Sequence, residues 1–124
     1  LEGRVHLVGR VPNETRPALY AAADVFLFPT RLEGFGMPVL EAMATGLPVV
    51  ATATGAIPEL IEHGRTGFLV TDPDDTELFA DYTLTLLKSP ALRREMGAAA
   101  RAEAAHWPWG RSAQRFVALC RELA

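Results

Sequence analysis

The sequence predicts an α/β domain built around a parallel sheet, with helices packed at its C-terminal end. Short apolar runs alternate with helical stretches through residues 5–70, and only helical stretches follow after Thr71. The run at residues 25–28 is apolar at every position, which is typical of a strand covered on both faces and therefore of a parallel sheet. We expect about four strands in the order β-α-β-α-β-α-β, followed by three helices.

Each of the first three predicted strands leads into a helix. Asn13 is a typical helix N-cap, and Pro17 lies near the first turn of the helix that follows, where a missing N–H costs least. Pro38 presets the first turn of the next helix, and Gly46 ends it. The expected strands are residues 5–9, 25–28, 49–52 and 67–70, and the expected helices are residues 14–23, 38–45 and 57–62.

The C-terminal half is predicted to be helical. Asp74 or Asp75 can cap a helix that runs to about Lys88, and the pair Ser89-Pro90 is a strong start for another that runs to about residue 105. Residues 107–109, Trp-Pro-Trp, break that helix. A last helix is expected to run to about residue 123, with an apolar side that contains Phe116, Val117 and Leu119.

Composition and charge restrict the class of protein. The chain has 124 residues, 49% of them apolar, and a net charge of −3, which fits one folded domain and excludes a disordered chain. No apolar run is long enough to span a membrane, and a nucleic-acid module would show a basic surplus. Cys120 is the only cysteine and the three histidines are far apart, so no disulfide framework or metal cluster is predicted. We expect a cytoplasmic location.

Charge is unevenly distributed in the C-terminal half. Residues 72–81 carry five acids and no cation, whereas most charges in residues 88–121 are basic. Acids near the start of one helix and bases further along suit the helix dipoles, so two solvated helix faces are the simpler interpretation. The alternative is a basic face that contacts anionic lipid or a partner domain.

The strongest candidate for a binding site is the segment at residues 33–41. In parallel sheets, ligands bind beyond the carboxyl ends of the strands, and this segment follows the predicted strand at residues 25–28. Gly34 and Gly36 allow the backbone to approach a ligand, and the helix that starts there offers free N–H groups to a phosphate. Glu33 and Glu41 could accept hydrogen bonds from sugar hydroxyls. The residues alone make a site for a phosphate and a polyol plausible.

Residues 33–41 resemble the E-x7-E motif of retaining, nucleotide-sugar-dependent glycosyltransferases of the GT-B type, family 4. The similarity to the C-terminal domain of that family covers nearly the whole chain, at residues 9–12, 19–25, 33–36, 40–44, 46–51, 57–59 and 64–70. The resemblance implies a partial Rossmann-like domain that binds the sugar nucleotide. It identifies residues 1–124 as an incomplete copy of that domain, with the N-terminal acceptor-binding domain and two strands lying outside the chain.

The resemblance also implies roles for individual residues. It makes Glu33 the catalytic carboxylate, which accepts hydrogen bonds from the donor sugar. The backbone N–H groups of Phe35 and Gly36 would hold the same sugar ring. The other implied contacts are Val39 and Leu40 to the diphosphate through their N–H groups, Glu41 to the ribose hydroxyls, and Arg10 and Val11 to the nucleotide base.

The reaction implied is transfer of a sugar from a nucleotide diphosphate sugar to an acceptor, with retained anomeric configuration. The family uses no metal or other cofactor for this step, and relies on backbone dipoles and basic side chains to stabilise the leaving diphosphate. Two other functions stay open: a nucleotide-sugar epimerase of the same shape, and a non-catalytic module that keeps the fold but binds a partner.

The resemblance also predicts an unpaired edge. In the family's strand order, the two missing strands would lie between the strand at residues 5–9 and the strand at residues 25–28. Without them, residues 25–28 become an exposed apolar edge, which favours association. We therefore expect this chain to dimerise through that edge, to rearrange its first strand, or to be the ordered part of a longer chain.

Overall fold

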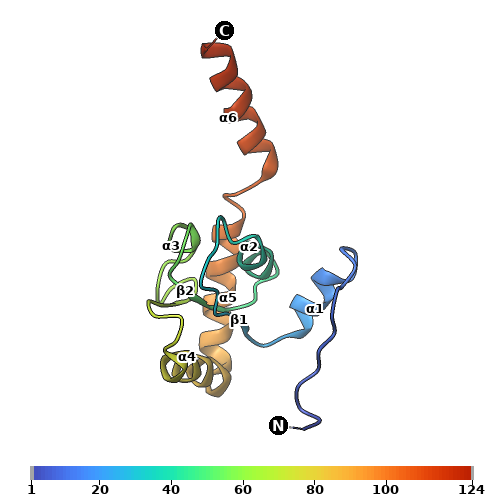
Figure 1. Cartoon of the computed structure of the whole chain (residues 1–124), viewed down its shortest axis with the longest axis vertical. Coiled ribbons are helices and arrows are strands. Elements are labelled where there is room, and N and C mark those ends of the chain that lie inside the picture. The colour runs from blue at the N-terminus through green and yellow to red at the C-terminus, as the bar shows by residue number, and fades with distance from the viewer. Residues whose placement is uncertain (1, 124) are drawn as a thin grey trace.

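The structure, a computed structural model, describes residues 2–123 and confirms the α/β architecture (Figure 1). Its sheet has three parallel strands in the order β1-β2-β3. In chain order the elements are α1 (Arg16–Ala22), β1 (Phe26–Phe28), α2 (Met37–Ala44), β2 (Val49–Thr52), α3 (Ile57–Leu60), β3 (Phe68–Val70), α4 (Thr76–Lys88), α5 (Pro90–Ala104) and α6 (Trp109–Glu122).

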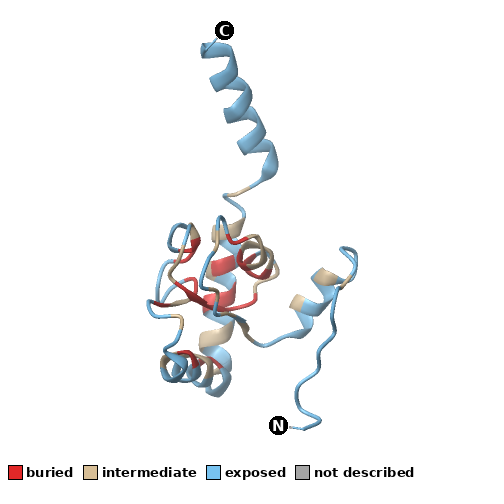
Figure 2. Cartoon of the chain, in the orientation of Figure 1, coloured by how far each residue is buried: buried red, intermediate tan, exposed pale blue. Residues whose placement is uncertain are grey.

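Strand β2 is the centre of the sheet, and each of its residues is buried. Because successive side chains of a strand point to opposite faces, Val49 and Ala51 pack toward α2 and α3, whereas Val50 packs toward α4. The sheet therefore lies between two apolar layers, as predicted for a parallel sheet. Figure 2 shows the buried residues gathered around this centre.

Helix α5 contributes to both apolar layers, through Met96 on the α4 side and Ala100 on the α2 side. It also packs against the turn that ends α2, where Gly46 has the left-handed conformation (φ 80°) predicted for the end of that helix. A Cβ atom on Gly97 would lie 2.1 Å from the carbonyl oxygen of Gly46. The two helices therefore meet at a distance that only glycine allows.

Two of the predicted helix caps are confirmed. The Asp75 side chain accepts a hydrogen bond from the N–H of Leu78 at 3.0 Å and caps α4. The Ser89 hydroxyl accepts a hydrogen bond from the N–H of Leu92 at 3.3 Å and caps α5. The predicted break at residues 107–109 is also confirmed, because α5 ends at Ala104 and α6 begins at Trp109.

The prediction of a strand at residues 5–9 is wrong, and the sheet has three strands where about four were expected. Leu7 is 96% exposed and Val5 is 62% exposed. Within residues 2–123, β1 pairs with β2 and its other edge has no strand beside it. An apolar run becomes a strand only where a neighbouring backbone satisfies its N–H and C=O groups, and residues 5–9 have no such neighbour.

Helix α1 begins later than predicted, and Asn13 is not its cap. The N–H groups of Thr15 and Arg16 both donate to the carbonyl of Pro12, at 3.1 and 3.2 Å, so this stretch forms a turn and Thr15 takes the N-cap position. The Asn13 side chain instead accepts from the guanidinium of Arg16 at 2.8 Å. Pro17 lies in the first turn of α1, as predicted.

The expectation that the strand at residues 25–28 is covered on both faces is wrong for Leu27, which is 45% exposed. Leu27 lies on the face of the sheet that α4 covers over β2 and β3, and β1 is the edge strand on that face. Other differences are shifts of one or two residues at element ends, such as the end of α3 at Leu60.

Helix α6 projects away from the body and buries none of its residues (Figures 1 and 2). The apolar residues predicted on one side of it are exposed: Phe116 by 68%, Val117 by 46% and Leu119 by 53%. Among the described residues, no helix is both long and apolar enough to cross a membrane.

The contact between α5 and α2 predicts the effect of a single methyl group. We expect Gly97→Ala to lower the free energy of unfolding by about 1–3 kcal/mol, because the new Cβ forces the helices apart. Gly110→Ala in α6 is the matched control, since its Cβ would meet open space and alanine favours helix by about 0.5–1 kcal/mol. Urea unfolding followed by circular dichroism measures both; equal stability of the two variants would contradict the prediction.

Candidate functional site

The loops that follow the three strands meet at the carboxyl edge of the sheet, where ligands of parallel sheets bind. Two contacts connect them. The N–H of Ala56, after β2, donates to the carbonyl of Gly34, after β1, at 3.2 Å. The guanidinium of Arg31, after β1, forms a two-bond ion pair with the carboxylate of Asp74, after β3. The segment that carries Glu33 is therefore held from both sides.

The loop after β2 approaches the backbone of Glu33 directly. Gly55 has a left-handed conformation (φ 56°), and a Cβ atom there would lie 1.9 Å from the Glu33 carbonyl oxygen. No other residue type fits this position without displacing one of the two loops. The structure makes Gly55 part of the framework of the candidate site. In the sequence, the signal for this role is the position of Gly55 between a strand and the short helix α3.

Gly36 sets the start of α2. It has φ 93° and ψ 41°, occupies the N-cap position, and is buried against Ile57 and Leu60 of α3. The N–H groups of Phe35, Gly36 and Val39 donate to no described residue, so the N-terminus of α2 keeps unpaired donors beside its positive dipole end.

Leu40 differs from its predicted role. Its N–H group donates to the Gly36 carbonyl at 3.1 Å, the first hydrogen bond of α2. It is therefore already engaged, and Val39 is the better donor of the two residues predicted for a diphosphate. The sequence could not separate them, because which N–H closes the first turn depends on where the helix begins.

Glu33 lies in the loop before α2 and is half-buried. Its Oε1 atom accepts a hydrogen bond from the N–H of Gly34 at 2.9 Å, which holds the side chain against its own loop. A carboxylate has capacity for several hydrogen bonds, so one such bond leaves acceptor positions for a polar ligand.

Glu41 lies one turn into α2 and faces α1. Its Oε2 atom accepts a hydrogen bond from the Tyr20 hydroxyl at 3.2 Å and lies 3.4 Å from the Arg16 guanidinium. Burial raises the pKa of the Tyr20 hydroxyl, and the negative charge and hydrogen bond of Glu41 raise that pKa further. The Tyr20 hydroxyl therefore keeps its proton and is the donor in the hydrogen bond to Glu41. Both contacts use Oε2, and within residues 2–123 no partner of Oε1 is found.

Arg10 and Val11, predicted to lie beside a nucleotide base, belong to the segment before α1. Arg10 is exposed, and it makes no hydrogen bond or ion pair with the described side chains; Val11 is half-buried. Glu33, Phe35, Gly36 and Val39 are thus close together because they share one loop and the first turn of α2. Arg10 makes no hydrogen bond or ion pair with these described residues.

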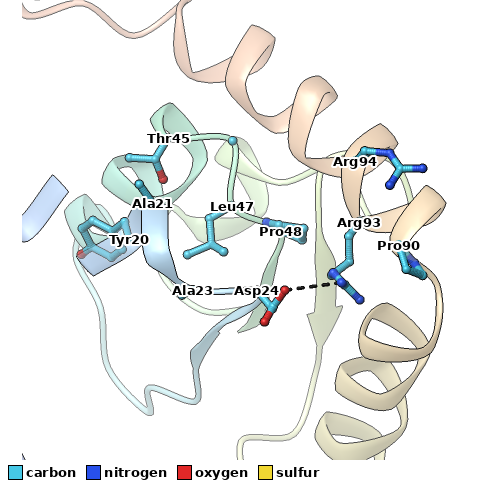
Figure 3. A pocket seen from close by; sticks show the side chains of 11 residues that line it. Tyr20, Ala21, Ala23, Asp24, Thr45, Leu47, Pro48, Pro90, Arg93 and Arg94 are labelled. Atoms are coloured by element: carbon cyan, nitrogen blue, oxygen red, sulfur yellow. Dashed lines mark ion pairs between the residues drawn. The ribbon is translucent and has the colours of Figure 1, made fainter. Parts of the chain in front are cut away.

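A cavity of about 290 Å³ opens at the opposite edge of the sheet (Figure 3). Asp24 precedes β1 and Pro48 precedes β2, so this cavity lies at the amino ends of the strands, where parallel sheets do not bind ligands. The guanidinium of Arg93, which lines the cavity, is already paired within the protein. It lies 3.4 Å from the Asp24 carboxylate and donates to the carbonyls of Leu86 and Leu87 at 2.9 and 2.8 Å. We interpret this cavity as a gap between packed elements.

No group of three or more His, Cys, Asp or Glu side chains within residues 2–123 is arranged to hold a metal ion. The roles predicted for the residues of the candidate site stay predictions. What the structure adds is a geometry in which one loop, one helix N-terminus and two carboxylates lie at or near the ligand-binding edge of a parallel sheet.

Residues 1–103 match the family described as glycosyl transferases group 1. The chain is 40% identical over 108 residues to an O-antigen chain mannosyltransferase B of Escherichia coli, covering 87% of this chain and 28% of that protein. The chain thus spans little more than a quarter of the length of this curated relative.

Solved structures also share the fold. A sucrose-phosphate synthase from Thermosynechococcus elongatus has a TM-score of 0.91 at 34% identity, over 97% of this chain and 30% of that one. The Anabaena protein HepE, solved in complex with UDP-glucose, has a TM-score of 0.78 at 36% identity, over 86% of this chain and 29% of that one.

The approach of Gly55 to Glu33 predicts how the loop responds to a methyl group. We expect Gly55→Ala to displace residues 33–36, to break the hydrogen bond from the Ala56 N–H to the Gly34 carbonyl, and to accelerate hydrogen exchange of the Ala56 amide by about tenfold or more. Gly64→Ala is the matched control, because Gly64 also has a positive φ (81°) but its Cβ would meet nothing. The control should cost about 1–2 kcal/mol of backbone strain and leave the exchange of the Ala56 amide unchanged. Equal exchange in the two variants would overturn the assignment.

Proposed function

Because the chain belongs to the group 1 glycosyl transferases and has the α/β fold of GT-B C-terminal domains, we propose that it is the donor-binding part of a retaining glycosyltransferase of family 4. In this proposal the donor is a nucleotide diphosphate sugar, and residues 1–124 are an incomplete copy of the donor-binding domain. The observation that carries it is the set of unpaired N–H groups at the start of α2, at the carboxyl edge of the sheet.

The diphosphate is assigned to the N-terminus of α2. The N–H of Val39 has no acceptor outside its own helix in the described part of the chain, and the helix dipole adds positive potential there. These groups also suit the leaving diphosphate, whose charge grows as the bond to the sugar breaks. Backbone donors held in place by a folded helix need no reorganisation during the reaction, which is consistent with a step that uses no metal.

The donor sugar is assigned to the loop before α2. The N–H groups of Phe35 and Gly36 are unpaired among residues 2–123, and the Glu33 carboxylate is held close to them by its bond to the Gly34 N–H. Two donors and a carboxylate on one short segment complement sugar hydroxyls, which both donate and accept hydrogen bonds. Glu33 is the catalytic residue in this proposal.

The ribose is assigned to Glu41. Its Oε2 atom is occupied by Tyr20 and Arg16, so Oε1 is the atom proposed to accept from the ribose hydroxyls. The contact with α1 fixes the carboxylate in one orientation, which reduces the entropy lost when the ribose binds. The base is assigned to the segment that contains Arg10 and Val11, which leads into α1.

Other parts of the proposal concern the whole protein. The acceptor is proposed to bind an N-terminal domain outside this chain. This chain covers 30% of the sucrose-phosphate synthase chain and 29% of the HepE chain, so most of each of those proteins lies outside the matched region. A cytoplasmic location and a peripheral contact of the basic C-terminal helices with anionic lipid are proposed with it. Two other functions are distinguishable by experiment: an epimerase converts the nucleotide sugar without an acceptor, and a binding module converts nothing.

Variants of the two carboxylates test the site. The full-length protein is titrated with UDP-glucose, UDP-N-acetylglucosamine and GDP-mannose. We expect Glu33→Ala to weaken binding of the preferred sugar nucleotide about 10-fold or more. The same variant should change the affinity for the matching nucleoside diphosphate little. Glu41→Ala should weaken both ligands, because both contain the ribose. Turnover should fall in both variants.

The control for Glu41 is Tyr20→Phe, which removes the contact from α1 and keeps the carboxylate. If Tyr20→Phe weakens binding as much as Glu41→Ala does, Glu41 acts by holding α1 and not by binding ribose. Conversion of the sugar nucleotide without an acceptor would favour the epimerase, and an absence of binding by the unaltered protein would contradict the proposal as a whole.

We also propose that the 124-residue chain self-associates through the free edge of β1. The N–H of Phe26 donates to the carbonyl of Pro48 at 2.9 Å, so the N–H of the next residue, Leu27, points away from β2. Sedimentation should show a dimer fraction that rises with concentration. Leu27→Pro removes the outward donor and should give a monomer, whereas Leu27→Ala keeps that donor and should still associate. A monomeric unaltered chain at every concentration would contradict the proposal.

A further inference from the structure

We propose that Trp107, in the junction between α5 and α6, is a positioning residue that holds Phe35 and thereby orients the backbone N–H groups that bind the donor sugar. The inference rests on the proposed function, because it concerns how the sugar part of the same site is held. Trp107 lies more than 70 positions after Phe35 in the chain, and it is proposed to act on the loop at residues 33–36.

The contact itself is aromatic. The rings of Phe35 and Trp107 lie with their centroids 5.8 Å apart and their planes at 67°, an edge-to-face pair. This arrangement places the positive edge of one ring on the negative face of the other and prefers a restricted range of orientations. The pair therefore restrains where the Phe35 side chain, and with it the Phe35 backbone, can lie.

The loop needs such a restraint because Phe35 stands between two glycines. Gly34 is exposed, and a Cβ atom there would meet nothing within 4 Å; Gly36 has φ 93°. Glycine has the most backbone freedom of any residue, so the backbone on both sides of Phe35 has little stiffness of its own. It depends on contacts from other elements, such as the hydrogen bond from the Ala56 N–H to the Gly34 carbonyl. Phe35 is the one side chain between the two glycines, and it is also the residue whose N–H group is assigned to the sugar.

Trp107 is itself well fixed. Its indole N–H donates to the Glu103 carboxylate at 3.4 Å, and its backbone N–H donates to the carbonyl of Ala104 at 3.1 Å. Its ring packs against the apolar layer on the α2 side of the sheet. Helix α5, which leads to it, is locked onto the end of α2 by the close approach of Gly97 to Gly46. Trp107 is thus held by α5, which packs against the C-terminal end of α2, while Phe35 precedes the N-terminal end of α2.

The surroundings of Phe35 leave the ring free to move if Trp107 is removed. A cavity of about 220 Å³ adjoins the pair, lined by Phe35, Met37, Leu40, Trp107, Trp109 and Ser112. Phe35 is 38% exposed. A ring in a tightly packed core would stay in place without one neighbour, but a ring beside an open cavity loses the contact that orients it.

The effect should be specific to the sugar. Phe35 and Gly36 are assigned to the sugar ring, whereas the diphosphate is assigned to the Val39 N–H, which α2 holds through its own hydrogen bonds. Loss of the Trp107 contact should therefore weaken a nucleotide sugar more than the nucleoside diphosphate. A purely structural role for Trp107 would weaken both ligands alike.

The test compares two ligands across a set of variants of the full-length protein. Isothermal titration uses UDP-glucose, UDP-N-acetylglucosamine and GDP-mannose, each with UDP or GDP as its counterpart. For the preferred sugar nucleotide, we expect Trp107→Ala to raise Kd about 3- to 10-fold and to leave the Kd of the nucleoside diphosphate within about twofold. Trp107→Phe, which keeps an aromatic ring, should restore most of the affinity for the sugar nucleotide.

Trp109→Ala is the matched control. Trp109 lines the same cavity, is 77% exposed and forms no ring pair with Phe35 in the described structure. It should leave both Kd values unchanged. If Trp107→Ala fails to fold, Glu103→Ala removes the acceptor of the indole N–H and should give a smaller change in the same direction.

A double-mutant cycle completes the test. Because Phe35→Leu and Trp107→Ala remove the same contact, their effects on sugar-nucleotide affinity should not add. Equal weakening of both ligands by Trp107→Ala, additive effects in the cycle, or no effect at all would overturn the inference. A failure of the unaltered protein to bind any of the sugar nucleotides would instead overturn the proposed function, so the two failures are distinguishable.

Discussion

The burial of β2 on both faces and along both edges is the constraint on which the rest of the structure depends. Its side chains supply the two apolar layers alternately, and its backbone pairs with β1 on one side and β3 on the other. Parallel pairing requires a crossover between successive strands, so α2 and α3 must each return the chain to the amino edge. That return places every strand-to-helix loop at the same carboxyl edge.

Close approach of backbone to backbone then shapes the candidate site. Gly55 lies against the carbonyl of Glu33, and Gly97 lies against the carbonyl of Gly46. The first contact holds the loop that carries Glu33, and the second holds α5 beside α2. In both places a methyl group would collide with a carbonyl oxygen, so packing here depends on the absence of a side chain. The N–H donors at the start of α2 are presented by elements that cannot shift independently.

Helix α5 connects the two edges of the sheet. It begins at the amino edge, where Arg93 joins the start of β1 to the end of α4, and it leads to Trp107 beside the loop at residues 33–36. The segments outside this framework, residues 5–9 and α6, bury little. The free edge of β1 is the surface that the proposed self-association would use.

The sequence by itself determined the fold class, the elements from residue 25 onward, the caps Asp75 and Ser89, and the segment at residues 33–41 as the candidate site, because these depend on local patterns of apolar residues, glycine and capping side chains. Only the tertiary structure decided that residues 5–9 form no strand, that Leu40 closes the first turn of α2, that Glu41 contacts Tyr20, and that Gly55 and Trp107 support the loop. Each of these depends on a partner distant in the chain or on where a helix begins, and the pattern within one segment carries neither.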